Sequence, residues 1–282
     1  LQMGMVGAER IFLVLDTKEA PENKGTHQPE VLQGDIVFEH VWFAYQDENW
    51  VLKDISFHIK AGQTLALVGA TGAGKSSIIN LLNRFYEINK GTIRIDGRDI
   101  REYPLAYLRS KITTVLQDTF LFSDSIANNI TLNNPQITRE QLEATAREVG
   151  AHEFIERLPQ RYDYNVMERG ATLSAGQAQL ISFIRALVYD PAILVLDEAT
   201  SSVDTQTEAL IQHVLYKLIQ QCTSIIIAHR LSTIQKADTI IVMDHGEVKE
   251  MGNHQELLKF NSYYKRLYDL QFKSEGIEKS SS

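Results

Sequence analysis

The chain has 282 residues, enough for one large domain or two small ones with a substantial core. Its composition, 44% hydrophobic and 23% charged, is that of an ordinary globular protein. The formal net charge of −8 argues against a nucleic-acid partner, because Lys and Arg are not in surplus to neutralise phosphates. The single cysteine, Cys222, excludes a disulfide within the chain, which fits a reducing compartment.

The first residues have the pattern of a helix that continues from an earlier segment. Met5, Ala8, Phe12 and Leu15 form one apolar stripe within residues 1–16, which lack an initial methionine and a capping residue. We therefore expect this segment to be an amphipathic helix, and the chain to be a piece of a larger protein. Residues 17–34 are rich in Pro, Glu, Asn, Lys and Gly without periodicity, and are expected to form a linker.

Strand patterns then lead to a glycine-rich loop. Short apolar runs at residues 36–38, 41–44 and 55–59 predict strands. The run at residues 64–68 also predicts a strand, and it ends at the sequence GATGAGKS. The apolar run that leaves this sequence, residues 78–85, has helical spacing. This is the strand–loop–helix setting in which a G-x-x-x-x-G-K-[ST] motif binds phosphate.

The loop chemistry follows from its residue types. Glycines allow successive backbone N–H groups to turn towards an anion, and the next helix directs its positive end to the same point. Lys75 is expected to reach the β- and γ-phosphates, and the Ser76 hydroxyl to ligate Mg²⁺. The predicted phosphate-binding residues are Gly69, Thr71, Gly72, Ala73, Gly74, Lys75, Ser76 and Ser77. The chain is therefore predicted to bind a nucleoside triphosphate.

The middle of the chain has helical patterns without strands between them. After a strand at 92–95, a short helix at 104–109 and a strand at 112–116, helical spacing occupies residues 125–130, 139–149 and 152–158. This stretch is predicted to be a helical insert.

Strands and helices alternate again from residue 175. Helices are expected at 175–188 and 205–219, and apolar strands at 193–196, 224–228 and 239–243. Apolar strands separated by helices indicate a parallel sheet that is covered on both faces. The polar tail at 273–282 is expected to be disordered.

Two carboxylates follow the strand at residues 193–196. Ligands collect at the carboxyl ends of parallel strands, so Asp197 and Glu198 are expected to reach the nucleotide. Asp197 is predicted to hold Mg²⁺ as an oxygen ligand. Glu198 is predicted to orient or deprotonate the attacking water.

A second helix start is a candidate for anion contact. Ser174 is a favourable N-cap type, and the small residues Ala175 and Gly176 leave backbone N–H groups accessible at the start of the helix. Many helices begin with such a cluster, so its position ahead of the two-carboxylate strand is what gives it weight.

The two segments together carry a resemblance to a known family. LSAGQ, which ends at Gln177, followed by ILVLDEATSSVD resembles the signature and Walker B segments of ATP-binding cassette (ABC) ATPases. The resemblance extends from about residue 35 to residue 270. It implies that Tyr45 stacks on adenine, that Gln117 senses Mg²⁺ and faces a membrane domain, that Asp204 lies in a loop between subunits, and that His229 contacts the γ-phosphate.

The resemblance also implies a fold, cofactors and partners. The implied α/β fold is a P-loop NTPase core with a mainly parallel sheet, an N-terminal antiparallel β subdomain and an inserted α-helical subdomain at about 120–188, within an ATPase domain at 35–272. The cofactors are ATP and Mg²⁺, with Ser76, Gln117 and Asp197 as the metal ligands. Two such domains, identical or merely related, pair head to tail, and Ser174, Ala175, Gly176 and Gln177 of one close over the ATP of the other.

Within the ABC family, further segments of the chain resemble those of exporters. Residues 168–170 (Glu-Arg-Gly) and 8–16 resemble exporter segments, so the chain looks like the nucleotide-binding domain of a half-transporter whose membrane domain belongs to the same polypeptide. Residues 1–16 would then be the end of the helix that connects the two domains. Its place would be the cytoplasmic face of the cell (inner) membrane. Two alternatives remain open: an ABC ATPase without a membrane partner, and a nucleotide-gated module with weak hydrolysis.

Two positions depart from the family pattern. Ala175 stands where a glycine is usual, and Ala178-Gln179-Leu180 stands where Arg-Gln-Arg is usual, which puts full turnover in question. For Phe120 and Phe122, the sequence favours equally a place in the core and a place against the membrane domain.

Overall fold

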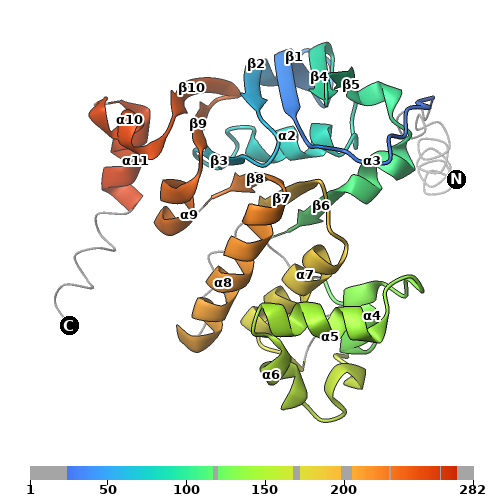
Figure 1. Ribbon diagram of the computed structural model, residues 1–282. Helices are drawn as coiled ribbons and strands as arrows, with labels where there is room; N and C mark the ends of the chain where they lie inside the picture. Colours follow the sequence, from blue (N-terminus) through green and yellow to red (C-terminus); the bar gives the residue numbers. More distant parts are fainter. Residues whose placement is uncertain are drawn as a thin grey trace, which may run out of the picture.

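The computed structural model describes residues 24–116, 120–167, 172–197, 205–228, 230–260 and 262–271. An antiparallel sheet lies at the top of Figure 1, a second sheet crosses the middle, and a group of helices lies below. This arrangement confirms the predicted α/β fold with an antiparallel sheet, a mainly parallel core sheet and a helical insert. The predicted helix at 1–16, the first part of the linker and the tail at 273–282 lie outside the described residues.

The core sheet has six strands in the order β10-β9-β3-β8-β7-β6. They are β3 (Thr64–Val68), β6 (Ile112–Val115), β7 (Ile193–Asp197), β8 (Thr223–Ile227), β9 (Thr239–Asp244) and β10 (Glu247–Gly252). Neighbours are parallel except at the edge, where β10 pairs with β9 in the antiparallel direction. Strand β10 was not predicted from the sequence, because an edge strand with polar residues lacks the apolar run that marks the others.

Both faces of the core sheet are covered, and the residues of β3 divide between them. Leu65 and Leu67 belong to one hydrophobic cluster, while Ala66 and Val68 belong to the other, as the two-residue period of a strand requires. Helix α2 (Lys75–Leu82) and the antiparallel sheet cover the first face. Helices α7 (Ala175–Val188) and α8 (Thr205–Gln221) cover the second.

The antiparallel sheet has the order β2-β1-β4-β5, with β1 (Ile36–Ala44), β2 (Trp50–Ile59), β4 (Lys90–Ile95) and β5 (Arg98–Asp99). The two predicted strands at 36–38 and 41–44 are a single strand. A register shift between Phe38 and Val41, with His40 at φ 49°, interrupts the alternation and leaves both Phe38 and Val41 buried.

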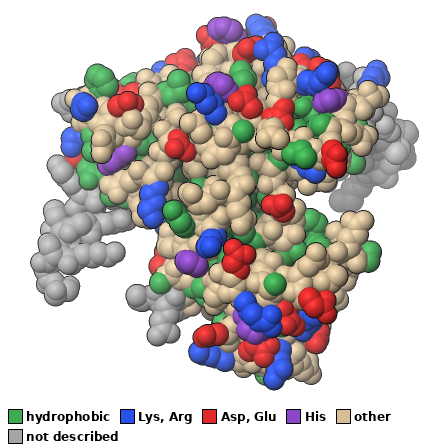
Figure 2. Space-filling view, viewed as in Figure 1, with side chains coloured by type: hydrophobic (Ala, Val, Ile, Leu, Met, Phe, Trp, Pro, Cys, Tyr) green, Lys and Arg blue, Asp and Glu red, His purple; other side chains and the backbone are tan. Residues whose placement is uncertain are grey.

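The helical part contains α4 (Ile126–Thr131), α5 (Arg139–Glu148), α6 (His152–Glu156) and the short 3-10 turn η2 (Arg161–Asp163). Within residues 120–167 the only β pairing is the isolated bridge between Ser125 and Asn165, so the predicted helical insert is confirmed. Acidic and basic side chains are interspersed over this part of the surface in Figure 2. Glu143, for example, forms ion pairs with Arg139 and Arg147.

The remaining described helices come after β5, β8 and β10 in the chain. They are η1 (Ile100–Glu102), α3 (Leu105–Lys111), α9 (Leu231–Lys236), α10 (His254–Lys259) and α11 (Tyr263–Gln271). Of these, only the region of α3 was predicted. Among the described residues, no helix combines the length and apolarity that crossing a membrane requires.

Residues 24–34, the described part of the predicted linker, have no helix or strand but are held against the antiparallel sheet. The hydroxyl of Tyr107 donates to the Pro29 carbonyl at 2.7 Å. The two carboxylate oxygens of Asp96 accept the backbone N–H groups of Gln33 at 2.7 Å and Asp35 at 2.9 Å. The chain therefore enters the domain along a fixed path.

Candidate functional site

The glycine-rich loop joins β3 to α2, and at two of its glycines a Cβ would collide with a strand beside the loop. Gly69 has φ 149°, and a Cβ there would lie 2.2 Å from the Met243 carbonyl oxygen of β9. Gly74 has φ 103°, and a Cβ there would lie 2.7 Å from the Leu52 Cδ2 of β2. The loop thus turns tightly between two neighbouring strands, which is why these positions require glycine.

Helix α2 presents its positive end to this loop. Gly74 is the N-cap residue, no side chain caps the helix start, and no acidic residue lies in the first turn. The backbone N–H groups of the first turn and the dipole of the helix therefore favour an anion at this point.

Lys75 lies across the loop. Its Nζ donates hydrogen bonds to the carbonyl oxygens of Gly69 at 2.7 Å and Ala70 at 2.9 Å. Burial lowers the pKa of Lys75, and the negative charge of Asp197 partly opposes that shift. The ammonium is partly desolvated and close to a carboxylate, so an entering phosphate would meet a cation already held in place.

A cavity of about 290 Å³ brings together Asp197 and most of the predicted phosphate-binding residues, but not Gly69 or Ala73, which is buried in the core. It is lined by Thr71, Gly72, Gly74, Lys75, Ser76, Ser77, Asp197, Val51 and Ile227. Asp197, at the carboxyl end of β7, reaches the phosphate loop as the sheet argument predicts. Val51 and Ile227 were not predicted from the sequence, because apolar strand residues carry no motif and only the register of the sheets brings them to the cavity.

Tyr45 lies at the end of β1 beside α2. Its hydroxyl is 3.1 Å from the Ser77 Oγ and accepts a hydrogen bond from the Asn80 side-chain amide at 3.1 Å. Its ring packs edge-on against Phe43 and Tyr86. The side chain is 45% exposed, so it is not a core aromatic, and its contact with Ser77 joins it to the phosphate loop.

The signature segment begins α7. Ser174 is the N-cap: its Oγ accepts the Gln177 N–H at 3.2 Å, and the Gln177 Oε1 accepts the Ser174 N–H at 3.0 Å. Ser174 and Ala175 are exposed, while Gly176 is buried. Of the described residues, none from the start of α7 lines the cavity at the phosphate loop, and Gln177 lines a separate hollow beside α6. Within one chain the structure does not bring these two segments together.

The departure from Arg-Gln-Arg has a packing consequence. Leu180 is 1% exposed and belongs to the hydrophobic cluster beneath the core sheet, and Ala178 packs against the same cluster. In this chain the two positions contribute apolar burial at the point where charged side chains are usual.

Several predicted residues fall outside the described part of the chain. They are Gln117, Glu198, Asp204 and His229, together with the exporter-like segment 168–170. Their neighbours are described: Asp197 ends β7, α8 begins at Thr205, and Ala228 follows β8.

The aromatic pair Phe120 and Phe122 is exposed. The two side chains are 57% and 53% exposed and meet edge to face, with centroids 4.9 Å apart. The core reading of this pair is therefore wrong.

Comparisons with known proteins agree with this geometry. A family model for ABC transporters matches residues 52–201. The chain is 50% identical over 279 residues to an uncharacterised ABC transporter ATP-binding protein, YknV, of Bacillus subtilis (strain 168), covering 99% of this chain and 46% of that one. It is 47% identical to an ATP-dependent lipid A-core flippase of Haemophilus influenzae (strain 86-028NP), covering 96% and 46%.

A solved structure gives the same result in three dimensions. A bacterial Atm1-family ABC exporter with ATP bound superposes with a TM-score of 0.84 at 38% identity, covering 96% of this chain and 48% of that one. The chain spans about half the length of the curated relatives it matches. The phosphate loop, the strand that ends in Asp197 and these matches together show that the chain belongs to the ABC transporter family and is its ATP-binding domain.

Proposed function

We propose that the chain is the ATP-hydrolysing motor of an exporter and that it works as a head-to-tail pair around two ATP molecules. One observation carries this proposal. The cavity at the phosphate loop contains the groups for one side of a triphosphate, while the start of α7 is exposed and apart from it. A second chain is needed to bring the two segments together.

The cavity suits ATP and Mg²⁺ by its chemistry. The uncapped start of α2 and Lys75 would hold the phosphates, with Lys75 exchanging the Gly69 and Ala70 carbonyls for phosphate oxygens. Asp197 and Ser76 line the same cavity and, with Gln117, offer the oxygen ligands that Mg²⁺ prefers. Bound Mg²⁺ would supply charge neutralisation on the phosphates.

The partner chain would complete the cage. Ser174, Gly176 and Gln177 would approach the γ-phosphate with the positive end of α7, adding hydrogen-bond donors that Lys75 alone cannot supply. Ala175 keeps its N–H, so its methyl group costs no donor. ATP bound between the two chains would then stabilise the dimer, and hydrolysis would weaken it.

Hydrolysis itself would depend on residues next to the described strands. Glu198 would align or deprotonate the attacking water, His229 would steady the transferred phosphoryl group, and Asp204 would lie at the contact between the chains. Tyr45, exposed beside Ser77, would stack on the adenine ring.

The similarity to known transporters supports a coupling of ATP hydrolysis to transport. One relative that is 48% identical is named a probable multidrug resistance ABC transporter ATP-binding/permease protein, from Bacillus subtilis (strain 168), and this chain covers 40% of its length. We infer that the same polypeptide has a membrane domain and that this chain lies at the cytoplasmic face of the membrane. Exposed Phe120 and Phe122 would face it. Closing and opening of the pair would drive that domain between two access states.

The decisive experiment is the solution mass of the Glu198→Gln chain by size-exclusion chromatography with light scattering. We expect a monomer without nucleotide and a dimer with Mg-ATP, because the variant keeps binding and slows hydrolysis by orders of magnitude. Lys75→Ala in the same background should stay monomeric, since it lacks the phosphate contact.

Other outcomes would overturn parts of the proposal. A Glu198→Gln chain that hydrolyses ATP at the wild-type rate removes Glu198 from the reaction. A chain that binds Mg-ATP tightly yet stays monomeric at high concentration favours pairing with a different subunit. Absence of hydrolysis in the wild-type pair favours a nucleotide-gated module.

A further inference from the structure

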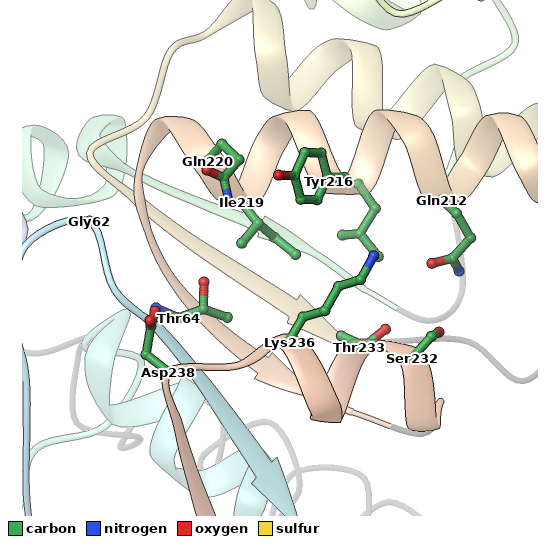
Figure 3. A pocket seen from close by; sticks show the side chains of 11 residues that line it. Gly62, Thr64, Gln212, Tyr216, Ile219, Gln220, Ser232, Thr233, Lys236 and Asp238 are labelled. Atoms are coloured by element: carbon green, nitrogen blue, oxygen red, sulfur yellow. The ribbon is translucent and has the colours of Figure 1, made fainter. Parts of the chain in front are cut away.

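A second cavity, of about 510 Å³, lies between α8, α9 and the amino end of β3 (Figure 3). The phosphate loop follows the carboxyl end of β3, and the five residues of this strand span roughly 16 Å. The second cavity therefore lies at the amino end of β3 and the nucleotide cavity at its carboxyl end, and the two share no lining residue. Its volume is within the range of about 300–1,000 Å³ that holds small organic ligands.

The cavity is lined by apolar side chains from α8 and by polar side chains from α8, α9 and the segments next to β3 and β9. Leu215, Ile219 and the ring of Tyr216 come from α8. Lys236, near the end of α9, extends towards α8 in Figure 3, with its Nζ 5.4 Å from the centroid of the Tyr216 ring. A cation next to an aromatic ring, at a cavity whose lining is largely polar with one apolar wall from α8, is an arrangement that receives a flat, negatively charged molecule.

Several polar groups in the cavity have no protein partner among the described residues. Lys236 makes no ion pair there, and its contact with the Tyr216 ring is the one interaction found for its ammonium. The Tyr216 hydroxyl, the Gln220 amide and the Ser232 hydroxyl likewise make no hydrogen bond within the described part of the chain. These groups are available to a ligand.

The one carboxylate of the cavity is already used. Asp238 accepts the backbone N–H of Thr64 at 2.8 Å, and so holds the loop before β9 against the start of β3. Among the described residues, Asp238 and Lys236 form no ion pair with each other. The charge that a ligand meets at the mouth of the cavity is therefore positive.

We infer that this cavity is a second ligand site, specific for a small aromatic anion such as an aryl carboxylate. The ring lies between Tyr216 and the apolar side chains of α8. The carboxylate pairs with Lys236, and Gln220 and Ser232 donate further hydrogen bonds. The inference concerns binding alone and does not depend on the proposed transport function.

The site joins two helices that begin next to the predicted catalytic segments. Helix α8 starts at Thr205, and α9 starts at Leu231, after Arg230. Arg230 forms an ion pair with Glu208 of α8, so the two helices are linked near their starts as well as at Lys236 and Tyr216.

The test uses 2-naphthoate as the probe and the 282-residue chain as the protein, with binding measured by calorimetry in saturating Mg-ATP. We expect saturable one-site binding that Lys236→Met weakens by at least about tenfold, the effect of losing a charged hydrogen bond. Lys236→Arg should retain the affinity. Lys259→Met is the matched control, because Lys259 is an exposed lysine on α10 away from the cavity. The neutral analogue 2-naphthalenemethanol should bind more weakly than the acid.

Three results would overturn the inference. The first is no binding of 2-naphthoate at millimolar concentration by a chain that still binds Mg-ATP. The second is equal affinity in the wild type and Lys236→Met. The third is binding only when Mg-ATP is absent, which would assign the probe to the nucleotide cavity.

Discussion

At the scale of single residues, the conformation of the phosphate loop depends on whether there is room for a side chain at each glycine. Gly69 approaches the Met243 carbonyl so closely that a methyl group has no room, whereas a Cβ at Gly72 meets nothing within 4 Å. Both residues have positive φ, so a side chain would strain the backbone at either position. Only at Gly69 would it also collide with another part of the chain.

This difference gives a matched prediction. Gly69→Ala should lower the free energy of unfolding by about 2–4 kcal/mol, from the collision and the strained backbone, and should abolish ATP binding. Gly72→Ala should cost about 1–2 kcal/mol from the backbone alone. Urea denaturation and nucleotide titration of both variants check this. Equal losses in the two would remove the collision as the cause.

Cys222 illustrates how burial decides reactivity. Its side chain is 5% exposed, its Sγ donates to the Leu218 carbonyl at 3.3 Å, and burial raises the pKa of the thiol to about 11 from 9.0. Because the folded pKa is the higher one, the folded state holds its proton longer, and stability should fall as the pH rises from about 9 to about 11.

The same shift predicts slow chemistry. At pH 8 the thiolate fraction is about 100-fold smaller in the folded chain than in the unfolded one, so labelling by iodoacetamide should be slower by at least that factor. Mass spectrometry with and without urea measures the two rates. Equal rates would mean that Cys222 is accessible and ionised in the native state.

At the scale of elements, the start of α7 has two separable roles. Ser174 caps its own helix through the reciprocal bonds with Gln177, and we propose that it also faces the ATP of a partner chain. An aspartate is an equally good N-cap, but it brings a negative charge towards the γ-phosphate.

Two substitutions at Ser174 should therefore have opposite effects. Ser174→Ala should lower the free energy of unfolding by about 1 kcal/mol through loss of the cap. Ser174→Asp should keep the stability and yet prevent the ATP-dependent dimer of the Glu198→Gln chain. Thermal denaturation and light scattering separate the two properties. A dimer that forms normally with Ser174→Asp would argue against the composite site.

At the scale of the whole molecule, ATP should stabilise the fold, because in the proposed complex it would bind between the phosphate loop and Asp197, which belong to distant parts of the sequence. At a concentration of 100 times Kd the gain is about 2.7 kcal/mol, which raises Tm by about 5–10 °C for a domain of this size. EDTA should reduce the rise, since Asp197 and Ser76 would lose their metal ion. Lys75→Ala should abolish it. A full rise in EDTA would remove Mg²⁺ from the binding step.

The sequence determined those parts of the protein whose signal is local. The run at residues 64–68, the glycine spacing and the following helix gave the phosphate loop, and the limits of α7 at Ala175 and Val188 match the expected helix. The hydrogen bonds of Lys75 with Gly69 and Ala70, and of Ser174 with Gln177, join residues close together in the chain, so the pattern itself carries the information.

The tertiary structure decided what depends on distant contacts. It joined the two short runs around His40 into β1, placed the polar strand β10 at the edge of the sheet, and made Val51 and Ile227 walls of the nucleotide cavity. It also exposed Phe120 and Phe122, which the sequence left undecided. In each case the outcome depends on which strand or helix lies alongside, and that contact joins residues far apart in the chain, which no local pattern records.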